Sequence, residues 1–247
     1  MAFDPNNSAA RRWGTTARTY DRAEIDVGLR QHMLGVYNYM ASGLLLTGIV
    51  AYLVANWAMA NPSVAMTLYG SPLKWVIMLA PIGLVFFLAA RIHAMSAFAA
   101  QTTYWVYAAL MGLSLSSIFL LYTGASITRV FFITAGTFGA MSLYGYTTKK
   151  DLSGWGSFLF MGVIGILIAS LVNIFIGSTM IQFVVSVLGV LIFTGLTAYD
   201  TQAIKEEYVE SDDRDTAGKK SIFGALRLYL DFINIFVSLM SLFGERR

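Results

Sequence analysis

The stretch RLYLDFINIFVSLMSLF, residues 227–243, decides how the rest of the chain is interpreted. It is apolar enough and long enough to cross a bilayer as a helix. Its polar residues recur at steps of four, three, four and three, a spacing that places them on one helical face. They are Arg227, Asp231, Asn234, Ser238 and Ser241. The stretch therefore predicts a membrane-spanning helix with one polar stripe.

The carboxylate in this stretch predicts where the helix lies. A charged side chain in the middle of a span costs about 2.5–3.5 kcal/mol on insertion scales and faces protein or water rather than lipid. Asp231 therefore predicts that the last helix is enclosed by other helices.

The composition is that of a membrane protein. Hydrophobic residues make up 57% of the 247 residues and charged residues only 13%, whereas soluble domains carry roughly 25% charged residues. The chain has no cysteine, which excludes disulfides, thiolate nucleophiles and Cys-ligated metals. The net charge of +3 reflects basic residues that anchor the ends of the spans, and it does not indicate nucleic-acid binding.

Seven apolar runs account for most of the sequence, and most approach the ~20 residues that a helix needs to cross the bilayer. They are Val36–Ala55, Leu73–Ala90, Thr102–Tyr122, Val130–Tyr144, Trp155–Ile176, Ile181–Thr201 and Ile222–Phe243. We therefore expect an all-α membrane protein, a bundle of seven transmembrane helices with the last helix at its centre. Residues 31–247 form this domain, and residues 1–30 form a charged cytoplasmic arm.

The basic residues predict the orientation of the chain. The connections on the N-terminal side hold twelve lysines and arginines, and those on the other side hold four. This positive-inside bias places the N-terminus in the cytoplasm and the C-terminus outside. The basic pair Arg246 and Arg247 opposes that placement. A re-entrant last run, which would put both termini in the cytoplasm, therefore stays open as an alternative.

Enzyme motifs are absent from the sequence. The two histidines, His32 and His93, lie at or beyond the ends of the runs, so no serine–histidine site is predicted within the bundle. The chain contains no HExxH, no GxSxG and no phosphate-binding P-loop. We expect a protein that is not an enzyme and that has no cofactor.

Two acids are the candidate functional residues, because Asp200 and Asp231 are the only carboxylates within the runs. Acids inside membrane spans are functional by default. Structural alternatives are an ion pair between Asp231 and Arg227 on one helix and an Asp200 that faces headgroup water. If the two acids meet, they would share a proton and act as a latch, or bind a hard cation such as calcium. Arg91 is a candidate competitor for one of them.

Depth is the difficulty with such a pair. Asp231 lies near the middle of its run, whereas Asp200 lies roughly 10 Å from the middle of its own at 1.5 Å per residue. The two meet only if a helix tilts or if a water-filled cavity reaches in from the cytoplasm.

Three sequence motifs resemble a known family. GLTAYDTQ at residues 195–202, LYLDFIN at 228–234 and SLYGYTT at 142–148 resemble the Bax inhibitor-1 family, also called the transmembrane Bax inhibitor motif proteins. The likeness covers nearly all of residues 30–247 and favours a bacterial member of the inner membrane. The arginine-rich segment 1–29 is not part of the pattern.

The resemblance implies a fold and a function. The family fold has seven helices with the last one surrounded by six. Members are implicated in a pH-sensitive calcium leak, in which an aspartate pair, matching Asp200 and Asp231, senses pH and exchanges with an arginine of the second helix, for which Arg91 is the candidate. Eukaryotic relatives are described as suppressors of cell death, and some bacterial relatives bind a membrane protease.

We therefore expect a cation leak channel that protonation of the Asp200–Asp231 pair gates, with Arg91, Arg227 and Asn234 as possible gating partners. The alternative is an interaction protein that modulates a membrane protease or a stress or cell-death pathway without transport. A proton-coupled transporter is a third possibility, although no internal repeat supports it.

Overall fold

The computed structural model describes the backbone of residues 7–247 and the side chains of residues 27–92 and 94–247. The predicted arm at residues 1–30 therefore lies mostly outside the described side chains, as does His93. Within the described range the chain is helical without a β-strand. The helices are α1 (Asn7–Ala60), α2 (Pro62–Ala65), α3 (Leu73–Arg91), α4 (Ala97–Leu121), α5 (Gly124–Thr147), α6 (Ser153–Ile176), α7 (Thr179–Glu206) and α8 (Arg214–Phe243).

Seven of these helices are long and apolar enough to cross a membrane, and each contains one of the predicted runs except for Tyr122, which directly follows α4. The short α2 is the exception. The helices extend past the apolar runs because polar caps begin them. The side chain of Thr123 accepts a hydrogen bond from the backbone N–H of Ser126 at the start of α5, and Asp213 caps α8 in the same way. The short fourth run is therefore a full-length helix.

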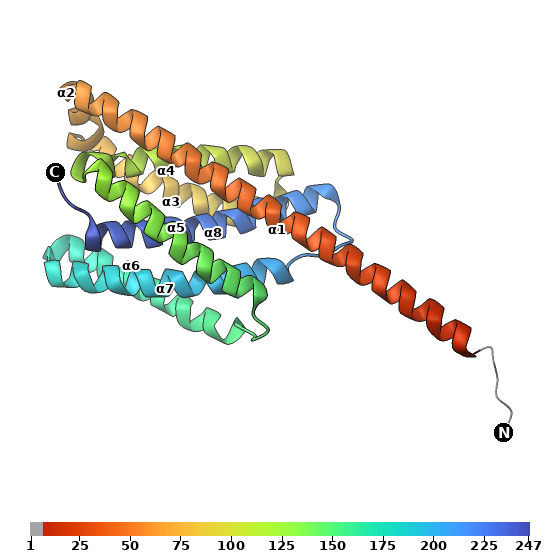
Figure 1. The fold of residues 1–247 in the computed structure, drawn as a ribbon. Coiled ribbons are helices and arrows are strands. Elements are labelled where there is room, and N and C mark those ends of the chain that lie inside the picture. The colour runs from red at the N-terminus through yellow and green to blue at the C-terminus, as the bar shows by residue number, and fades with distance from the viewer. Residues whose placement is uncertain (1–6) are drawn as a thin grey trace.

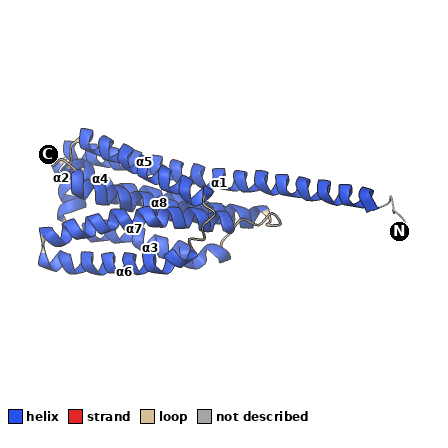
Figure 2. Ribbon diagram, turned by 60° about the horizontal axis from the view of Figure 1, so that its bottom comes forward, coloured by secondary structure: helices blue, strands red, loops and turns tan. Residues whose placement is uncertain are grey.

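Helix α8 runs through the middle of the bundle (Figures 1 and 2). In its most apolar window 61% of residues are buried, against 11% to 33% in the other six spanning helices. It packs directly against α1, α4, α5 and α7, while α3 packs on α4 and α6 packs on α7. The predicted central position is confirmed, with four helices in direct contact and two outside them.

Buried hydroxyl groups hold the centre of the bundle together. Thr47 on α1 donates a hydrogen bond to the carbonyl of Ala108 on α4 (2.8 Å). Its hydroxyl also lies 2.7 Å from that of Tyr229 on α8. The Tyr229 ring packs edge-on against Tyr104 and Tyr107. These bonds satisfy polar groups that lipid could not, and so fix α8 relative to its neighbours.

The start of α1 and the C-terminal tail lie toward opposite ends of the bundle (Figure 1). The C-terminal tail pairs with the turn between α4 and α5, where the N–H of Thr123 donates to the carbonyl of Glu245 (2.9 Å) and that of Arg247 donates to Leu121 (3.0 Å). Helix α8 has 30 residues, about 45 Å at 1.5 Å per residue. The last run is thus one uninterrupted helix that is long enough to cross the membrane, which favours a complete span over the re-entrant alternative.

Candidate functional site

An arginine joins two acids where α7 ends and α8 begins. The guanidinium of Arg227, on α8, donates one hydrogen bond to Asp200 Oδ1 (2.7 Å) and another to Glu207 Oε1 (2.8 Å). Asp200 lies in the last two turns of α7, and Glu207 directly follows that helix. The arrangement fastens the end of α7 to α8 through one forked side chain.

The Asp200 side of this network is largely removed from solvent, whereas the side chain of Glu207 is 41% exposed. The side chain of Asp200 is 12% exposed and that of Arg227 is 21% exposed. Charge-assisted bonds in such surroundings are strong, and removing one partner leaves an uncompensated charge. The alternative in which Asp200 faces headgroup water is therefore wrong.

Asp231 lies one helical turn further along α8 and has a different environment. The residue is 3% exposed, and its Oδ2 has no hydrogen-bond partner among the described residues. The alternative of an ion pair with Arg227 on the same helix is wrong, because Arg227 pairs with Asp200 and Glu207. Side chains on a helix lean toward its N-terminus, so Arg227 reaches back to Asp200 instead of forward to Asp231. Asp231 nevertheless lies within electrostatic range of both.

Arg91 is not brought to the two acids. It is exposed at the end of α3, and among the described side chains it makes no salt bridge with Asp200 or Asp231. Arg227 makes the contact for which Arg91 was the candidate. The sequence did not single out Glu207, because this residue lies in the acidic connection between α7 and α8, and acidic connections are usually solvated.

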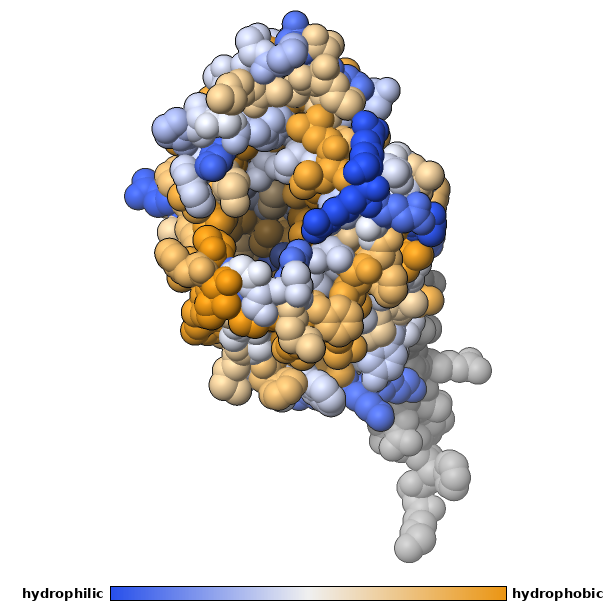
Figure 3. All heavy atoms as spheres, turned by 90° about the vertical axis from the view of Figure 1, so that its left-hand side faces the viewer, coloured by the Kyte–Doolittle hydropathy of each residue, from blue (hydrophilic) through white to orange (hydrophobic). Residues whose placement is uncertain are grey.

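The outer part of the polar stripe lines a cavity of about 360 Å³ between α4, α6, α7 and α8. Asn234, Ser238 and Ser241 of α8 contribute to its wall. From α7, Gln182 Nε2 and Ser186 Oγ donate hydrogen bonds to Ser241 Oγ (3.3 and 2.9 Å). Figure 3 shows that this end of the molecule is hollowed. Asp231 does not line the cavity, so the stripe is divided between a charged half and a neutral half.

His32 is placed differently from its prediction. His32 lies on α1 four residues before the apolar run, yet it is buried against α8. Its Nδ1 is 3.2 Å from Ser221 Oγ on α8, and its Nε2 has no partner among the described residues. The expectation that no histidine enters the bundle is therefore wrong, because α1 begins well before the apolar run from which its span was predicted.

No group of three or more histidine, aspartate or glutamate side chains is placed to hold a metal ion within the part of the chain that was searched. Calcium takes six to eight oxygen ligands. An ion between Asp200 and Asp231 would have to draw Asp200 from Arg227 and complete its shell with water.

Comparisons with known proteins agree with the sequence motifs. A family model described as "Inhibitor of apoptosis-promoting Bax1" matches residues 29–247. The chain is 50% identical over 224 residues to inner membrane protein YbhL of Escherichia coli strain K12, covering 89% of this chain and 94% of that protein. It is 46% identical to an uncharacterized protein of Rickettsia prowazekii, covering 94% and 97% of the two chains. An uncharacterized membrane protein of Streptococcus pyogenes is 37% identical, covering 89% and 95%.

Proposed function

This integral membrane protein belongs to the Bax inhibitor-1 family, and we propose that it is a non-enzymatic cation leak channel, with calcium as the permeating ion. Protonation at Asp200 and Asp231 gates it. The membrane is the bacterial inner membrane, and the name of the Escherichia coli relative, an inner membrane protein, supports this location. The N-terminus lies in the cytoplasm, as the excess of basic residues on that side indicates.

The observation that carries this proposal is the buried carboxylate oxygen of Asp231. A carboxylate oxygen without a donor in a membrane interior needs a proton or a cation. Arg227 is the nearest cation on the same helix, but Asp200 and Glu207 engage it. Asp231 is thus a site at which a proton and a metal ion compete.

The proposed gate is an exchange of ion-pair partners by Arg227, between Asp200 and Asp231. With Asp231 protonated, Arg227 stays on Asp200 and Glu207 and holds the end of α7 against α8. Loss of that proton creates a second anion one turn away, which draws Arg227 from Asp200. The end of α7 is then released, and the flux of cations increases as the pH rises.

The neutral cavity lined by the outer part of the polar stripe forms the second part of the proposed path of the cation through the protein. Oxygen atoms of Asn234, Ser238 and Ser241 replace part of the hydration shell of a cation without binding it tightly. Asp231 lies between this cavity and the Arg227 network. The path of the cation is closed there when the carboxyl group of Asp231 is protonated.

A vesicle assay tests the proposal. The protein is reconstituted in vesicles loaded with a calcium-sensitive dye, and influx is followed as the pH is varied. Asp231→Asn removes the titrating group and is expected to flatten the pH profile. The matched control is Asp151→Asn, which changes an exposed acid in the connection between α5 and α6. Hydrogen bonds from Ser153 lower the pKa of Asp151, so this acid stays ionised near neutral pH. An unchanged profile in Asp231→Asn contradicts the proposal.

The second candidate function is that of an interaction protein. The observation that favours it is that α1 begins at Asn7 and extends beyond the bundle (Figure 1). In that case, the aspartates are structural and the projecting helix binds a membrane protease or another complex. Deletion of residues 1–29 then abolishes binding to the partner, while the calcium flux of reconstituted vesicles is the same with and without the protein.

A further inference from the structure

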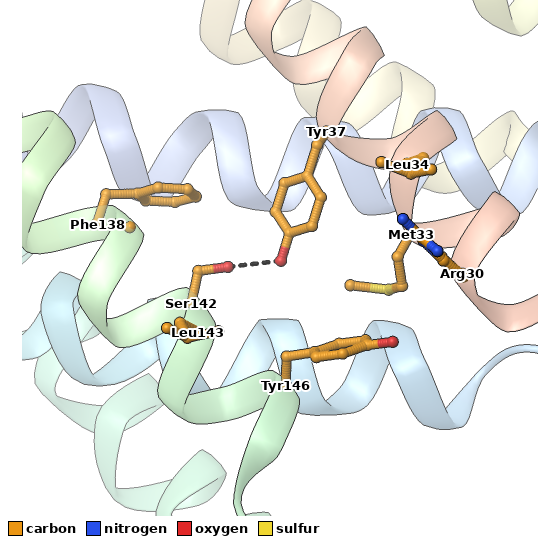
Figure 4. A pocket seen from close by; sticks show the side chains of 9 residues that line it. Arg30, Met33, Leu34, Tyr37, Phe138, Ser142, Leu143 and Tyr146 are labelled. Carbon is orange, nitrogen blue, oxygen red and sulfur yellow. Dashed lines mark hydrogen bonds between the residues drawn. The ribbon is translucent and has the colours of Figure 1, made fainter. Parts of the chain in front are cut away.

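A groove of about 460 Å³ lies between α1 and α5, away from the acids and the neutral cavity. Helix α1 contributes Arg30, Met33, Leu34 and Tyr37, and α5 contributes Phe138, Gly139, Ser142, Leu143 and Tyr146. Figure 4 shows these side chains arranged around a common space, across which Tyr37 and Ser142 are hydrogen-bonded, with Phe138 on one side of this bond and Met33 on the other. The two helices are held apart here, because α1 packs mainly on α4 and α8, and α5 on α7 and α8.

The walls of the groove are chemically divided. Its sides are apolar, formed by the side chains of Met33, Leu34, Phe138 and Leu143. Its one charged lining residue is Arg30, which is exposed. Lys205 of α7 is a second cation near the groove, although it does not line it. Its ammonium group donates a hydrogen bond to the carbonyl of Tyr146 (3.0 Å) and lies 5.7 Å from the centre of the Tyr146 ring.

The charged end of the groove coincides with the edge of the membrane. The apolar run of α1 starts at Val36 and that of α5 ends at Tyr144, so Arg30 and Tyr146 both lie just beyond an apolar run, at the end of the bundle where the groove opens. Arginine and tyrosine at such positions lie at the level of the lipid headgroups. Phe138 lies nine residues inside the end of α5, about 13 Å deeper at 1.5 Å per residue.

A chain of hydroxyl groups crosses the groove from α1 through α5 to α7. Tyr37 OH lies 2.7 Å from Ser142 Oγ, which in turn lies 2.9 Å from Thr201 Oγ1 on α7. Thr201 donates onward to the carbonyl of Thr197 (2.7 Å). These polar groups satisfy one another, so the interior of the groove presents apolar surface to whatever enters it.

We propose that this groove binds one anionic phospholipid, with the phosphate at Arg30 and an acyl chain along Met33, Phe138 and Leu143. The charge of Arg30 complements the phosphate, and Lys205 adds to the positive potential at the same level. The apolar walls fit a hydrocarbon chain and offer no polar partner to a peptide backbone. This inference does not depend on ion transport.

Native mass spectrometry of the detergent-solubilised full chain tests the proposal. The protein is mixed with phosphatidylglycerol or phosphatidylcholine at equal concentration, and the retained lipid adducts are compared. The wild type is expected to retain phosphatidylglycerol in preference to phosphatidylcholine. Arg30→Gln should lower that preference roughly 5-fold, the effect of one interfacial cation. The matched control Arg91→Gln removes an exposed arginine that does not line the groove and should retain the preference.

A second pair of variants tests the acyl chain. A Cβ atom added at Gly139 meets no atom within 4 Å, so the backbone there tolerates a side chain, and Gly139→Leu should occupy the groove and abolish retention of phosphatidylglycerol. Gly136→Leu is the control, because it adds the same side chain to open space one turn away on α5, outside the groove. Equal retention of both lipids by the wild type, or of phosphatidylglycerol by Gly139→Leu and the wild type, overturns the proposal.

Discussion

Arg227 is the residue on which the arrangement of the acids depends. It sits four positions before Asp231, yet both of its hydrogen bonds to acids cross to the neighbouring end of α7. An acid four residues C-terminal to a base is the weaker order for an ion pair within a helix. The direction in which the side chain leaves α8 thus explains why Asp200 is paired and Asp231 is not.

Removing Arg227 should destabilise the protein. In Arg227→Met, Asp200 remains buried without a compensating charge, and we expect a loss of about 3 kcal/mol in the free energy of unfolding. Equilibrium unfolding in mixed micelles measures the loss. Adding Asp200→Asn should restore part of it, because the uncompensated charge is then gone.

Arg129→Met is the control for this effect. Arg129 also pairs with an acid, but the side chains of Arg129 and Glu245 are 57% and 59% exposed. Exposed pairs contribute at most about 1 kcal/mol, so this variant should unfold nearly like the wild type. Equal losses in Arg227→Met and Arg129→Met would show that Asp200 is not buried.

Asp213 predicts an acid-dependent part of the stability outside the membrane. The backbone N–H and hydroxyl of Thr216 donate to its carboxylate, and they lower the pKa of Asp213 from its ordinary value of 3.8. A lowered folded-state pKa stabilises the fold above pH 3.8, and this stabilisation is lost as the pH falls through the lowered value.

Asp213→Asn keeps an oxygen at the start of α8 but cannot titrate. We expect its melting temperature to fall less steeply with acidification than that of the wild type, in a series of melting curves from about pH 2 to 7. Parallel curves for the two proteins would mean that the cap does not depend on the charge.

At the scale of elements, α8 carries one polar stripe with two environments. Its first half meets charged residues at the end of α7, whereas its second half meets Gln182 and Ser186 earlier on the same helix. Because α7 and α8 run antiparallel, the end of one lies beside the start of the other. A continuous pattern in the sequence thereby becomes a charged site and a neutral cavity.

Cysteine labelling should distinguish the faces of α8, and the chain has no cysteine to interfere. Ser238→Cys faces the neutral cavity and should react with a water-soluble thiol reagent added from the C-terminal side, because only a hydrated thiol ionises readily. Ile235→Cys, which is 0% exposed, and the lipid-facing Leu191→Cys, which is 64% exposed, should not react. A Ser238→Cys that reacts no faster than these two would mean that the cavity is dry.

The contact between α5 and α7 depends on the absence of a side chain at Gly145. A Cβ atom there would overlap the backbone of Ala198. We expect Gly145→Ala to lower the free energy of unfolding by about 1–3 kcal/mol, because the helices must separate. Gly136→Ala on the same helix meets no atom within 4 Å and should be neutral in the same unfolding assay. A neutral Gly145→Ala would show that the two helices are not in close contact.

At the scale of the whole molecule, seven helices long and apolar enough to cross a membrane lie between the start of α1 and the C-terminal tail. The tail at residues 244–247 packs against the turn between α4 and α5, at the opposite end of the bundle from the start of α1. The basic pair Arg246 and Arg247 is thus accommodated on the less basic side, with the N–H of Arg247 bonded to Leu121.

Reporter fusions in a bacterial host check this topology. Green fluorescent protein at the N-terminus should fluoresce, and alkaline phosphatase at the C-terminus should be active, because the first folds in the cytoplasm and the second outside it. The reverse fusions are the control and should both be silent. Fusions that report the same side for both termini would contradict seven crossings.

The sequence by itself determined the spans, the central helix and the family, because these rest on local properties. Apolar runs of sufficient length specify helices across a bilayer, and the acid Asp231 specifies which helix is enclosed. The polar caps that lengthen α5 and α8 were also present in the sequence, at Thr123 and Asp213, but they lie outside the apolar runs from which the boundaries were predicted.

Only the tertiary structure decided which groups meet. Arg227 has Asp231, Asp200 and Glu207 within reach of a long side chain, and spacing along the chain cannot rank partners on different helices. The antiparallel packing of α7 on α8 and the lean of side chains toward the helix N-terminus choose Asp200 and Glu207. The groove between α1 and α5 is likewise invisible in the sequence, because a space between helices depends on how far apart their neighbours hold them.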